Sequence, residues 1–352
     1  MRSACRIREA RSWITLERRQ DRLPLNELVI RTSFTELVGV EHPIVLAGMG
    51  GATSPELVAA VSNAGGLGIH GVTSIESSEI VSQVAAIRGK TPRPFGLNLL
   101  LHGADEDQVR VVLDAKPEII STAWPRDDQD LGQLFARAHE RGLKVMHMVP
   151  GAADAAKAAH AGADVIVAQG TDGGGHIGLM GTIVVVPAVV KEVAPIPVLA
   201  AGGIASGRGL AAALALGAAG VLVGTRFLAT TESELHDNFK RLIVESDGGD
   251  TIVTDIADIF LGVEWPGALE RIARNRAVER WLGRTNELRR HREELLPGMR
   301  EARLKGDPDE AIVYFGQSAA LVDDVVPVAR VIEDMVAEAE EIVGERLPNL
   351  IR

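Results

Sequence analysis

The 352-residue sequence has very little cysteine, few aromatic residues and fewer basic than acidic side chains. Its single cysteine, Cys5, excludes an intramolecular disulfide and any zinc site built from several cysteines. Aromatic residues make up 3% of the chain, and the formal net charge is −11 at pH 7. The scarcity of stacking rings and of positive charge argues against DNA, RNA or an anionic membrane as a partner.

Long apolar runs are also missing, since no stretch approaches the roughly 18 residues that a membrane helix needs. The lone cysteine favours a reducing, cytoplasmic compartment. Residues 1–29 are rich in arginine but lack the apolar core of a secretory signal, and Glu9, Glu17 and Asp21 count against a mitochondrial presequence. We expect this segment to be a poorly ordered extension, or the result of a start codon assigned too early.

The sequence does contain a repeated alternation of short apolar runs and alanine-rich helical segments. This alternation is typical of parallel βαβ units. A doubly wound sheet would fit it, but the number of runs and the turn residues that follow them favour a closed (β/α)8 TIM barrel, whose site is built by loops after the strands. The eight expected strands are Ile44–Leu46, Leu67–Ile69, Gly96–Leu99, Ile119–Ser121, Lys144–Met148, Val165–Gln169, Val198–Ala200 and Gly220–Val223.

The alternation stops shortly after the eighth expected strand. We assign residues 30–235 and 313–352 to the barrel, and residues 236–312 to a helical insertion after the eighth strand that caps the active site. Within the insertion, Ala268–Trp281 shows apolar positions at helical spacing and predicts a helix. This predicted helix carries three arginines, Arg271, Arg274 and Arg276.

Two of the expected strands end in glycine and predict a phosphate site. Gly202 and Gly203 follow the seventh strand, and Gly224 and Thr225 follow the eighth. Glycine lets backbone N–H groups approach an anion, and the N-terminus of the next helix adds a favourable dipole. Loops at these two strands form the phosphate site that recurs in TIM barrels. The alternative is that the glycines only form tight turns.

His176 is the candidate catalytic residue. It follows the sixth expected strand in a glycine-rich loop, Gly170–Gly178, where few side chains would pack around it. An imidazole can accept or donate a proton near pH 7. His139 and His160 fall on helical faces, and His236 and His291 lie in charged stretches, so these four are expected to be structural. No group of His, Asp and Glu has the spacing of metal ligands, so we predict no metal.

Two further strand ends have residues suited to a flat ring. The backbone of Gly48, Met49 and Gly50, after the first strand, can lie against a ring system because no bulky side chain intervenes. The amide of Asn98, at the end of the third strand, can bond a heteroaromatic ring or a ribityl hydroxyl, although strand-end asparagines often serve turns.

In their order along the chain, these motifs resemble the nitronate monooxygenase family, formerly called 2-nitropropane dioxygenases. The resemblance runs from about Thr35 to the C-terminus and implies a TIM barrel that binds FMN non-covalently, with His176 beside the reactive face of the flavin. It implies phosphate contacts from Gly202, Gly203, Gly224 and Thr225, and further cofactor contacts from Gly48, Met49, Gly50, Asn98, Gln169, Gly174, Gly175 and Gln317. The motifs that carry it are His42–Gly50, Val61–Gly68, Gln169–Gly178, Ala201–Ile204, Gly217–Phe227 and Gly316–Asp324.

The resemblance is less specific for the reaction, because the family is similar to NADH:quinone reductases and to flavin enoyl-ACP reductases. Many members carry Glu-Ala-Gly-Gly-His where this chain has Asp172–His176. Tyrosines often line nitronate pockets, but this chain has a single tyrosine, Tyr314. The leading expectation is oxidation of alkyl nitronates by FMN and O2 to carbonyl compounds and nitrite. His176 would remove the α-proton of a nitroalkane or bond its nitro group. Arg271, Arg274 or Arg276 would attract the anion, with a solvated helix face as the alternative place for these arginines.

Two alternatives stay open. One is an NAD(P)H-dependent reductase of quinones or enoyl thioesters, with His176 as proton donor or orienting group. The other is a phosphate-binding barrel without redox activity. A homodimer is one assembly that the sequence leaves open.

Overall fold

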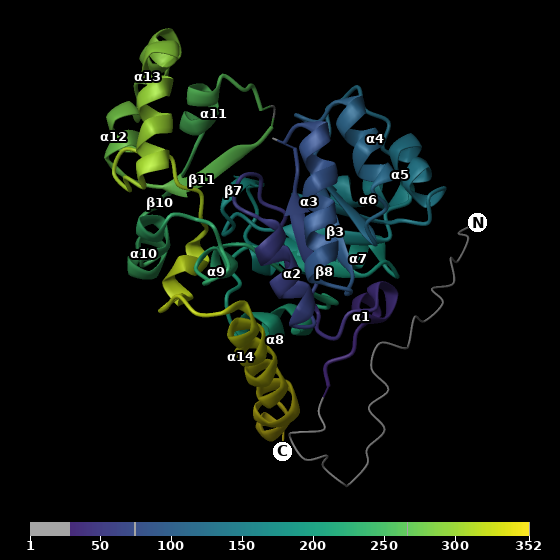
Figure 1. Ribbon diagram of the computed structural model, residues 1–352. Helices are drawn as coiled ribbons and strands as arrows, with labels where there is room; N and C mark the ends of the chain where they lie inside the picture. Colours follow the sequence, from purple (N-terminus) through teal and green to yellow (C-terminus); the bar gives the residue numbers. More distant parts are fainter. Residues whose placement is uncertain (1–28, 74, 266, 352) are drawn as a thin grey trace, which may run out of the picture.

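The computed structural model describes residues 29–73, 75–265 and 267–351. The predicted N-terminal extension therefore lies outside the described residues, apart from Val29. Eight strands form one parallel barrel and overlap all eight expected strands (Figure 1). They are β1 (Ile44–Leu46), β2 (Gly68–Gly71), β3 (Phe95–Leu100), β4 (Ile119–Ala123), β5 (Lys144–Val149), β6 (Val165–Gln169), β8 (Val198–Ala201) and β9 (Gly220–Val223).

The strand order confirms the predicted TIM barrel. Neighbours run β1-β9-β8-β6-β5-β4-β3-β2, and every pairing in this order is parallel. A parallel bridge between Val45 and Leu67 joins β1 to β2. All eight carboxyl ends therefore open on the same end of the barrel, where loops from distant parts of the sequence can meet.

Helices cover the outside of the barrel. Several of them begin directly after a residue whose side chain caps the helix. Asp105 and Gln108 form a capping box at the start of α4, and Ser54 caps α2, which begins at Pro55. The helices that alternate with the strands are α2 (Pro55–Asn63), α3 (Ser77–Lys90), α4 (Glu106–Asp114), α5 (Leu131–His139), α6 (Ala152–His160), α7 (Thr182–Val193) and α8 (Gly207–Ala215).

Two helices complete the barrel. The short helix α1 (Ser33–Val38) contributes Phe34 and Val38 to the same core cluster as Val45 and Leu67, so it plugs the amino-terminal end of the barrel. Helix α14 (Val328–Glu341) packs along α8 (Figure 1), where a Cβ atom at Gly207 would lie 2.5 Å from Glu338 Cβ. That close approach requires glycine.

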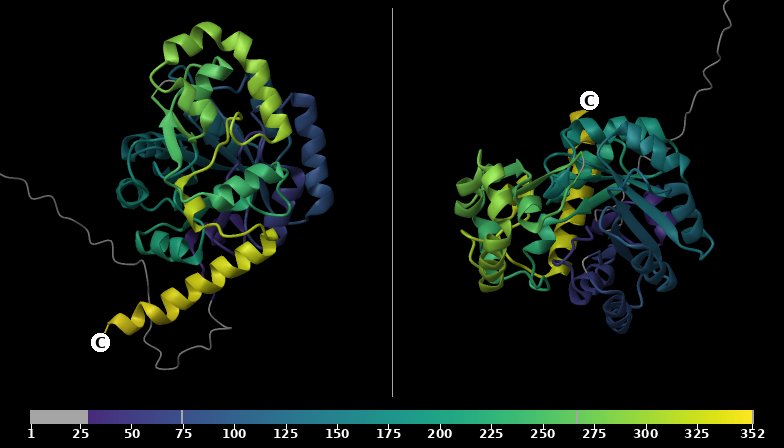
Figure 2. Two further views of the ribbon diagram at one scale, coloured as in Figure 1. Left: turned by 90° about the vertical axis from the view of Figure 1, so that its left-hand side faces the viewer. Right: turned by 90° about the horizontal axis from the view of Figure 1, so that it is seen from above.

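The segment 236–312 follows the eighth barrel strand as predicted and stands to one side of the barrel (Figure 2). Beyond the short turn α9 (Thr225–Leu228), it contains α10 (Asp237–Glu245), α11 (Ile256–Leu261), α12 (Arg276–Trp281) and α13 (Thr285–Lys305). It also contains two strands that the sequence did not predict, β10 (Thr251–Thr254) and β11 (Leu269–Ala273).

The predicted helix at Ala268–Trp281 is therefore wrong over its first half. Residues Leu269–Ala273 form β11, and helix begins only at Arg276. Strand β11 pairs antiparallel with β10 on one side and with β7 (Gly175–Ile177) on the other. A segment of five residues is too short to be assigned to helix or strand from periodicity alone, and here the two pairing partners decide. The same pairing corrects the expectation that His176 lies in a sparsely packed loop.

Candidate active site

The predicted cofactor residues lie at the carboxyl ends of the barrel strands, where packing brings many of them into contact. Asn98 donates its Nδ2–H to the carbonyl oxygen of Gly48 at 3.1 Å. A Cβ atom at Gly224 would lie 3.3 Å from the sulfur of Met49, and Gly50 is exposed in the same loop as Met49. The ends of β1, β3 and β9 thus meet at one place.

The segment after the insertion joins the same cluster. The N–H of Gly316 donates to Thr225 Oγ1 at 2.9 Å, and the N–H of Gln317 donates to the carbonyl oxygen of Asp172 at 2.9 Å. A Cβ atom at Gly174 would lie 2.7 Å from the nitrogen of Gly316. Gln317 therefore contacts the loop after β6 through its backbone, while its side chain is exposed.

The loops after β6 and β8 offer a ligand the backbone of two glycines and one buried side-chain oxygen that has no partner. Gly202 and Gly203 have φ angles of 96° and 74°, a left-handed conformation that glycine tolerates best. The N-cap residue Ser206 provides no side-chain cap for helix α8, which begins after this loop, but Glu338 Oε2 accepts the N–H of Arg208 in its first turn at 3.2 Å, so part of this helix start is already paired. Gln169 Oε1 is buried and has no hydrogen-bond partner among the described residues. These features fit a phosphorylated cofactor with a polar ring.

His176 lies on the short strand β7, directly across from Glu270 on β11. Its Nε2 lies 3.0 and 3.1 Å from the two carboxylate oxygens of Asp258, at the start of helix α11. The side chain of His176 is 15% exposed and that of Asp258 is 7% exposed. Water therefore competes little for this contact, which strengthens it.

Glu270 is the second carboxylate beside the histidine and is completely buried. Its Oε1 accepts the backbone N–H of Asp258 at 3.1 Å, while its Oε2 lies 3.9 Å from His176 Nε2, and the buried hydroxyl of Tyr314 also interacts with this carboxyl group. Burial, together with the charge of Asp258, raises the pKa of Glu270 to about 8. Glu270 is therefore mostly protonated at neutral pH.

His176, Asp258 and Glu270 also place one potential ligand atom each within 4.8 Å of one another. The sequence could not indicate this grouping by spacing, because His176 and Asp258 are 82 residues apart. The expectation that no metal is bound stays a prediction. The sequence did contain one signal for this site. Glu270 and Arg271 interrupt an otherwise apolar strand, and charged residues at core positions often have a functional role.

A group of rings lies over His176. The Trp265 ring stacks on the His176 ring with centroids 3.8 Å apart and an interplanar angle of 13°. Trp265 also contacts His102 at 4.6 Å and Trp124 at 6.4 Å between centroids. Trp124 directly follows β4 and has a φ angle of 53°, a strained conformation for a bulky residue. The sequence analysis missed these three rings.

The three arginines of the insertion are engaged in other contacts. Arg271 is 7% exposed, and its guanidinium donates to the carbonyl oxygen of Thr171 and to Thr251 Oγ1. Arg274 pairs with Glu279 at 3.2 Å.

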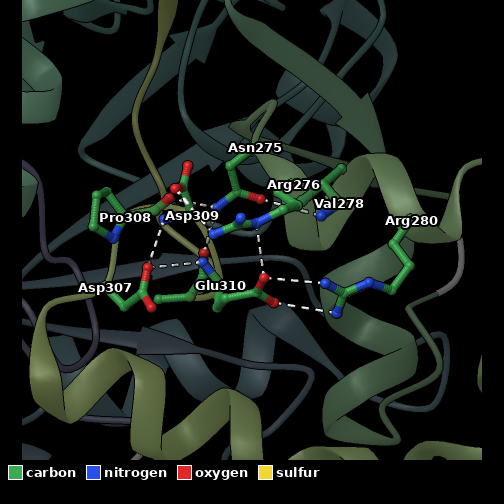
Figure 3. A network of polar contacts seen from close by, with 9 residues as sticks. Asn275, Arg276, Val278, Arg280, Asp307, Pro308, Asp309 and Glu310 are labelled. Carbon is green, nitrogen blue, oxygen red and sulfur yellow. Dashed lines mark hydrogen bonds and ion pairs between the residues drawn. The ribbon is translucent and has the colours of Figure 1, made fainter.

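Arg276 belongs to a network of polar contacts that joins α12 to the segment after α13 (Figure 3). It pairs with Asp309 at 3.1 Å and with Glu310 at 2.9 Å, and Arg280 also binds Glu310. This network and the contacts of Arg271 and Arg274 stabilise the insertion, so the expected role of these arginines in attracting an anion has no support in the geometry.

Comparison with known proteins identifies the family. The family model described as nitronate monooxygenase matches residues 31–109 and 102–338. The chain belongs to the nitronate monooxygenase family. It is therefore an oxidoreductase of a TIM-barrel family, as the sequence motifs predicted. Among the described helices, none is long and apolar enough to cross a membrane.

The proteins that this chain resembles have different names. The chain is 35% identical over 345 residues to the (3aS,4S,5R,7aS)-5-hydroxy-7a-methyl-1-oxo-octahydro-1H-indene-4-carboxyl-CoA dehydrogenase of Mycobacterium tuberculosis, covering 88% of this chain and 96% of that one. It is 29% identical to a probable nitronate monooxygenase of Staphylococcus saprophyticus, covering 90% and 99%. The solved structure of FabK from Thermotoga maritima matches with a TM-score of 0.83 and 38% identity, covering 92% and 100%.

Proposed function

We propose that this protein is an FMN-dependent oxidoreductase that acts across the Cα–Cβ bond of an acyl or enoyl thioester. The observation that carries the proposal is the pairing of His176 with the buried carboxylate of Asp258. A histidine held in this way is suited to proton transfer, and reactions at a thioester α-carbon require such a transfer. A bound flavin would accept or supply the hydride at the β-carbon.

Proton transfer distinguishes this proposal from nitronate oxidation. A nitronate has already lost its α-proton, so its oxidation needs no general base. A saturated thioester must lose the α-proton to His176 as the hydride leaves the β-carbon, and an enoyl thioester must gain both. One proton and one hydride balance the reaction in either direction. His176 backed by Asp258 therefore has a defined task with thioesters and little to do with a preformed nitronate.

The charges around His176 also favour a substrate without negative charge at the reacting carbon. The groups beside its Nε2 are the carboxyl groups of Asp258 and Glu270. Arg271, Arg274 and Arg276 are held by other protein groups. An anionic nitronate would thus meet the carboxylate of Asp258, beside a mostly protonated Glu270, and no free guanidinium from these three arginines.

The cofactor part of the proposal assigns FMN to the strand ends. Gly202, Gly203, Gly224 and Thr225 would hold the phosphate, with the backbone N–H groups of these loops as donors. The ring would lie near Gln169, whose Oε1 is buried without a partner. Gly48, Met49, Gly50, Asn98, Gly174, Gly175 and Gln317 stay predicted cofactor contacts.

The names of two relatives support the thioester class. One is a carboxyl-CoA dehydrogenase at 35% identity, and the other, FabK, belongs to the enoyl-reductase branch that the sequence motifs resemble, at 38% identity. In this chain an electron acceptor would serve the oxidation, and NAD(P)H would serve the reduction.

Anaerobic flavin reduction tests the proposal. The FMN-loaded protein is mixed separately with a saturated acyl-CoA, with NADH or NADPH, and with an alkyl nitronate, while the visible spectrum is followed. We expect bleaching by acyl-CoA, or bleaching by a nicotinamide followed by reoxidation with an enoyl-CoA. Bleaching by the nitronate alone would overturn the thioester proposal.

Nitronate oxidation with O2 is the second candidate. The family model and the relatives named as probable nitronate monooxygenases support it. His176 would then serve only nitroalkanes that arrive with the α-proton in place. In that case the rate with a preformed nitronate should hardly change when His176 is replaced.

A further inference from the structure

The contact between His176 and Asp258 determines which nitrogen of the histidine can react. An ionised carboxylate only accepts hydrogen bonds, so the ring must donate from Nε2, which lies 3.0 Å from Asp258 Oδ1. No hydrogen bond to Nδ1 occurs within the part of the chain that the structure describes. Nδ1 is thus the nitrogen left to exchange a proton.

We propose that Asp258 is a positioning residue that holds His176 in the tautomer protonated on Nε2 and leaves Nδ1 to exchange a proton with the substrate. This inference rests on the proposed function, in which His176 performs that transfer. Asp258 itself would not contact the reacting atoms. Its role resembles that of the carboxylate behind a catalytic histidine in hydrolases, which fixes the ring and its tautomer.

Glu270 in turn fixes Asp258. Its Oε1 accepts the N–H of Asp258, the third residue of helix α11. The first four N–H groups of a helix have no partner within it, and the N-cap residue Asp255 provides no side-chain cap here. The buried carboxyl of Glu270, on strand β11, therefore caps helix α11, which carries Asp258.

The pairing of β7 with β11 connects Glu270 to His176. Glu270 lies directly across from His176 in the β7–β11 ladder. The same ladder thus sets the position of the histidine and, through Glu270, the position of the carboxylate that holds it. A divalent cation between the three residues would need Nε2 as a ligand, whereas the positioning role assigns that nitrogen to Asp258, so the two roles exclude each other.

The tautomer of His176 is the first test, and it needs no substrate. The FMN-loaded full chain is labelled with 15N-histidine, and the ring signals of His176 are assigned by their loss in His176→Gln. We expect an Nε2–H pattern in the wild type and its loss in Asp258→Asn, because the amide can donate to the ring and favour the other tautomer. Asp255→Asn, in the same helix start, should keep the wild-type pattern.

An unchanged tautomer in Asp258→Asn would overturn the proposal. The FMN content of each variant reports whether it folds. If Asp258→Asn loses the flavin, Asp258→Ser gives the same readout. This test uses no substrate. If the tautomer changes in Asp258→Asn but the protein turns over no thioester, the positioning role of Asp258 is supported and only the thioester function is excluded.

Kinetics give the second test once a thioester substrate is in hand. We expect Asp258→Asn to lower kcat by about 10- to 100-fold with KM within about twofold, since supporting groups of this kind typically cost that much. Asp258→Glu should restore part of kcat, and Asp255→Asn should leave it unchanged. Equal kcat values in the wild type and Asp258→Asn would overturn the proposal.

Zinc binding gives the third test. Calorimetric titration of the FMN-loaded wild type with ZnCl2 should show no stoichiometric binding. One Zn²⁺ per chain, lost in each of His176→Gln, Asp258→Asn and Glu270→Gln, would overturn the positioning role and assign the three residues to a metal site.

Discussion

His176 and Glu270 face each other across two antiparallel strands, β7 from the loop after β6 and β11 from the insertion. One residue comes from the glycine-rich loop that marks the family, and the other from a segment whose sequence predicted a helix. Their pairing means that the insertion contributes directly to the surroundings of the candidate catalytic histidine. The predictions below test what this arrangement does.

Replacing His176 should remove proton transfer without removing the flavin. We expect His176→Gln to lower kcat with thioesters by about 10²- to 10⁴-fold, the usual contribution of general acid–base catalysis. FMN content should stay near that of the wild type. His139→Gln is the matched control, because His139 pairs with Asp164 on the outside of the barrel. A His176→Gln enzyme with wild-type kcat would contradict the assignment.

Glu270 should make the protein less stable as the pH rises. Its pKa is raised from 4.5 to about 8 in the folded state, so between these values the folded chain holds a proton that the unfolded chain has lost. This stabilisation is complete below about pH 4.5 and falls by at most about 1.4 kcal/mol per pH unit until the pH passes about 8. Glu270→Gln, which cannot ionise, should therefore gain stability relative to the wild type between pH 5 and pH 9.

Urea unfolding of the FMN-free proteins at several pH values measures this difference. Glu279→Gln is the control, because Glu279 is half exposed in the same insertion and pairs with Arg274. If the difference between Glu270→Gln and the wild type is the same at pH 5 and pH 9, Glu270 does not carry the expected proton.

A methyl group at Gly203 should weaken flavin binding. The φ angle of 74° disfavours any other residue, and the added Cβ would lie 3.2 Å from Asp172 Cβ. We expect Gly203→Ala to raise the Kd for FMN about tenfold, since the left-handed conformation costs alanine roughly 1–2 kcal/mol. Fluorescence titration of the FMN-free protein measures the Kd.

Gly89→Ala is the matched control for this prediction. Gly89 lies within α3, and its Cβ would meet no atom within 4 Å. Its FMN affinity should equal that of the wild type. If Gly203→Ala also binds FMN with wild-type affinity, the loop after β8 does not hold the phosphate.

The ring of Trp265 should stabilise His176 by stacking. The two rings lie 3.8 Å apart and nearly parallel. A double-mutant cycle with Trp265→Ala and His176→Ala should give a coupling energy of about 0.5–1.5 kcal/mol in urea unfolding. The same cycle with His139→Ala should give none. A coupling near zero for the first cycle would mean that this contact does not contribute to stability.

The sequence predicted the barrel because its signals are local. Each strand is a short apolar run between turn residues, and several helix starts have a capping residue, as at Ser54 and Asp105. The glycines after β8 and β9 predicted positions where backbone must approach a ligand, and two of them have positive φ angles. Local patterns of this kind need no information from elsewhere in the chain.

The insertion was harder to predict for the opposite reason. The segment Leu269–Ala273 forms a strand only because β10 and β7 supply its hydrogen bonds from distant parts of the sequence. The arginines beside it looked free in the sequence, yet their partners, such as Thr171 and Glu310, come from other elements.

The sequence alone thus determined the parallel barrel, the glycine loops and the choice of His176, because apolar periodicity and turn chemistry act between near neighbours. Only the tertiary structure decided what surrounds that histidine. Asp258 is 82 residues from it, and Glu270 and Trp265 come from the same insertion. Whether such residues meet depends on strand pairing and helix packing over the whole fold, so the proton-transfer group forms only when β11 joins β7.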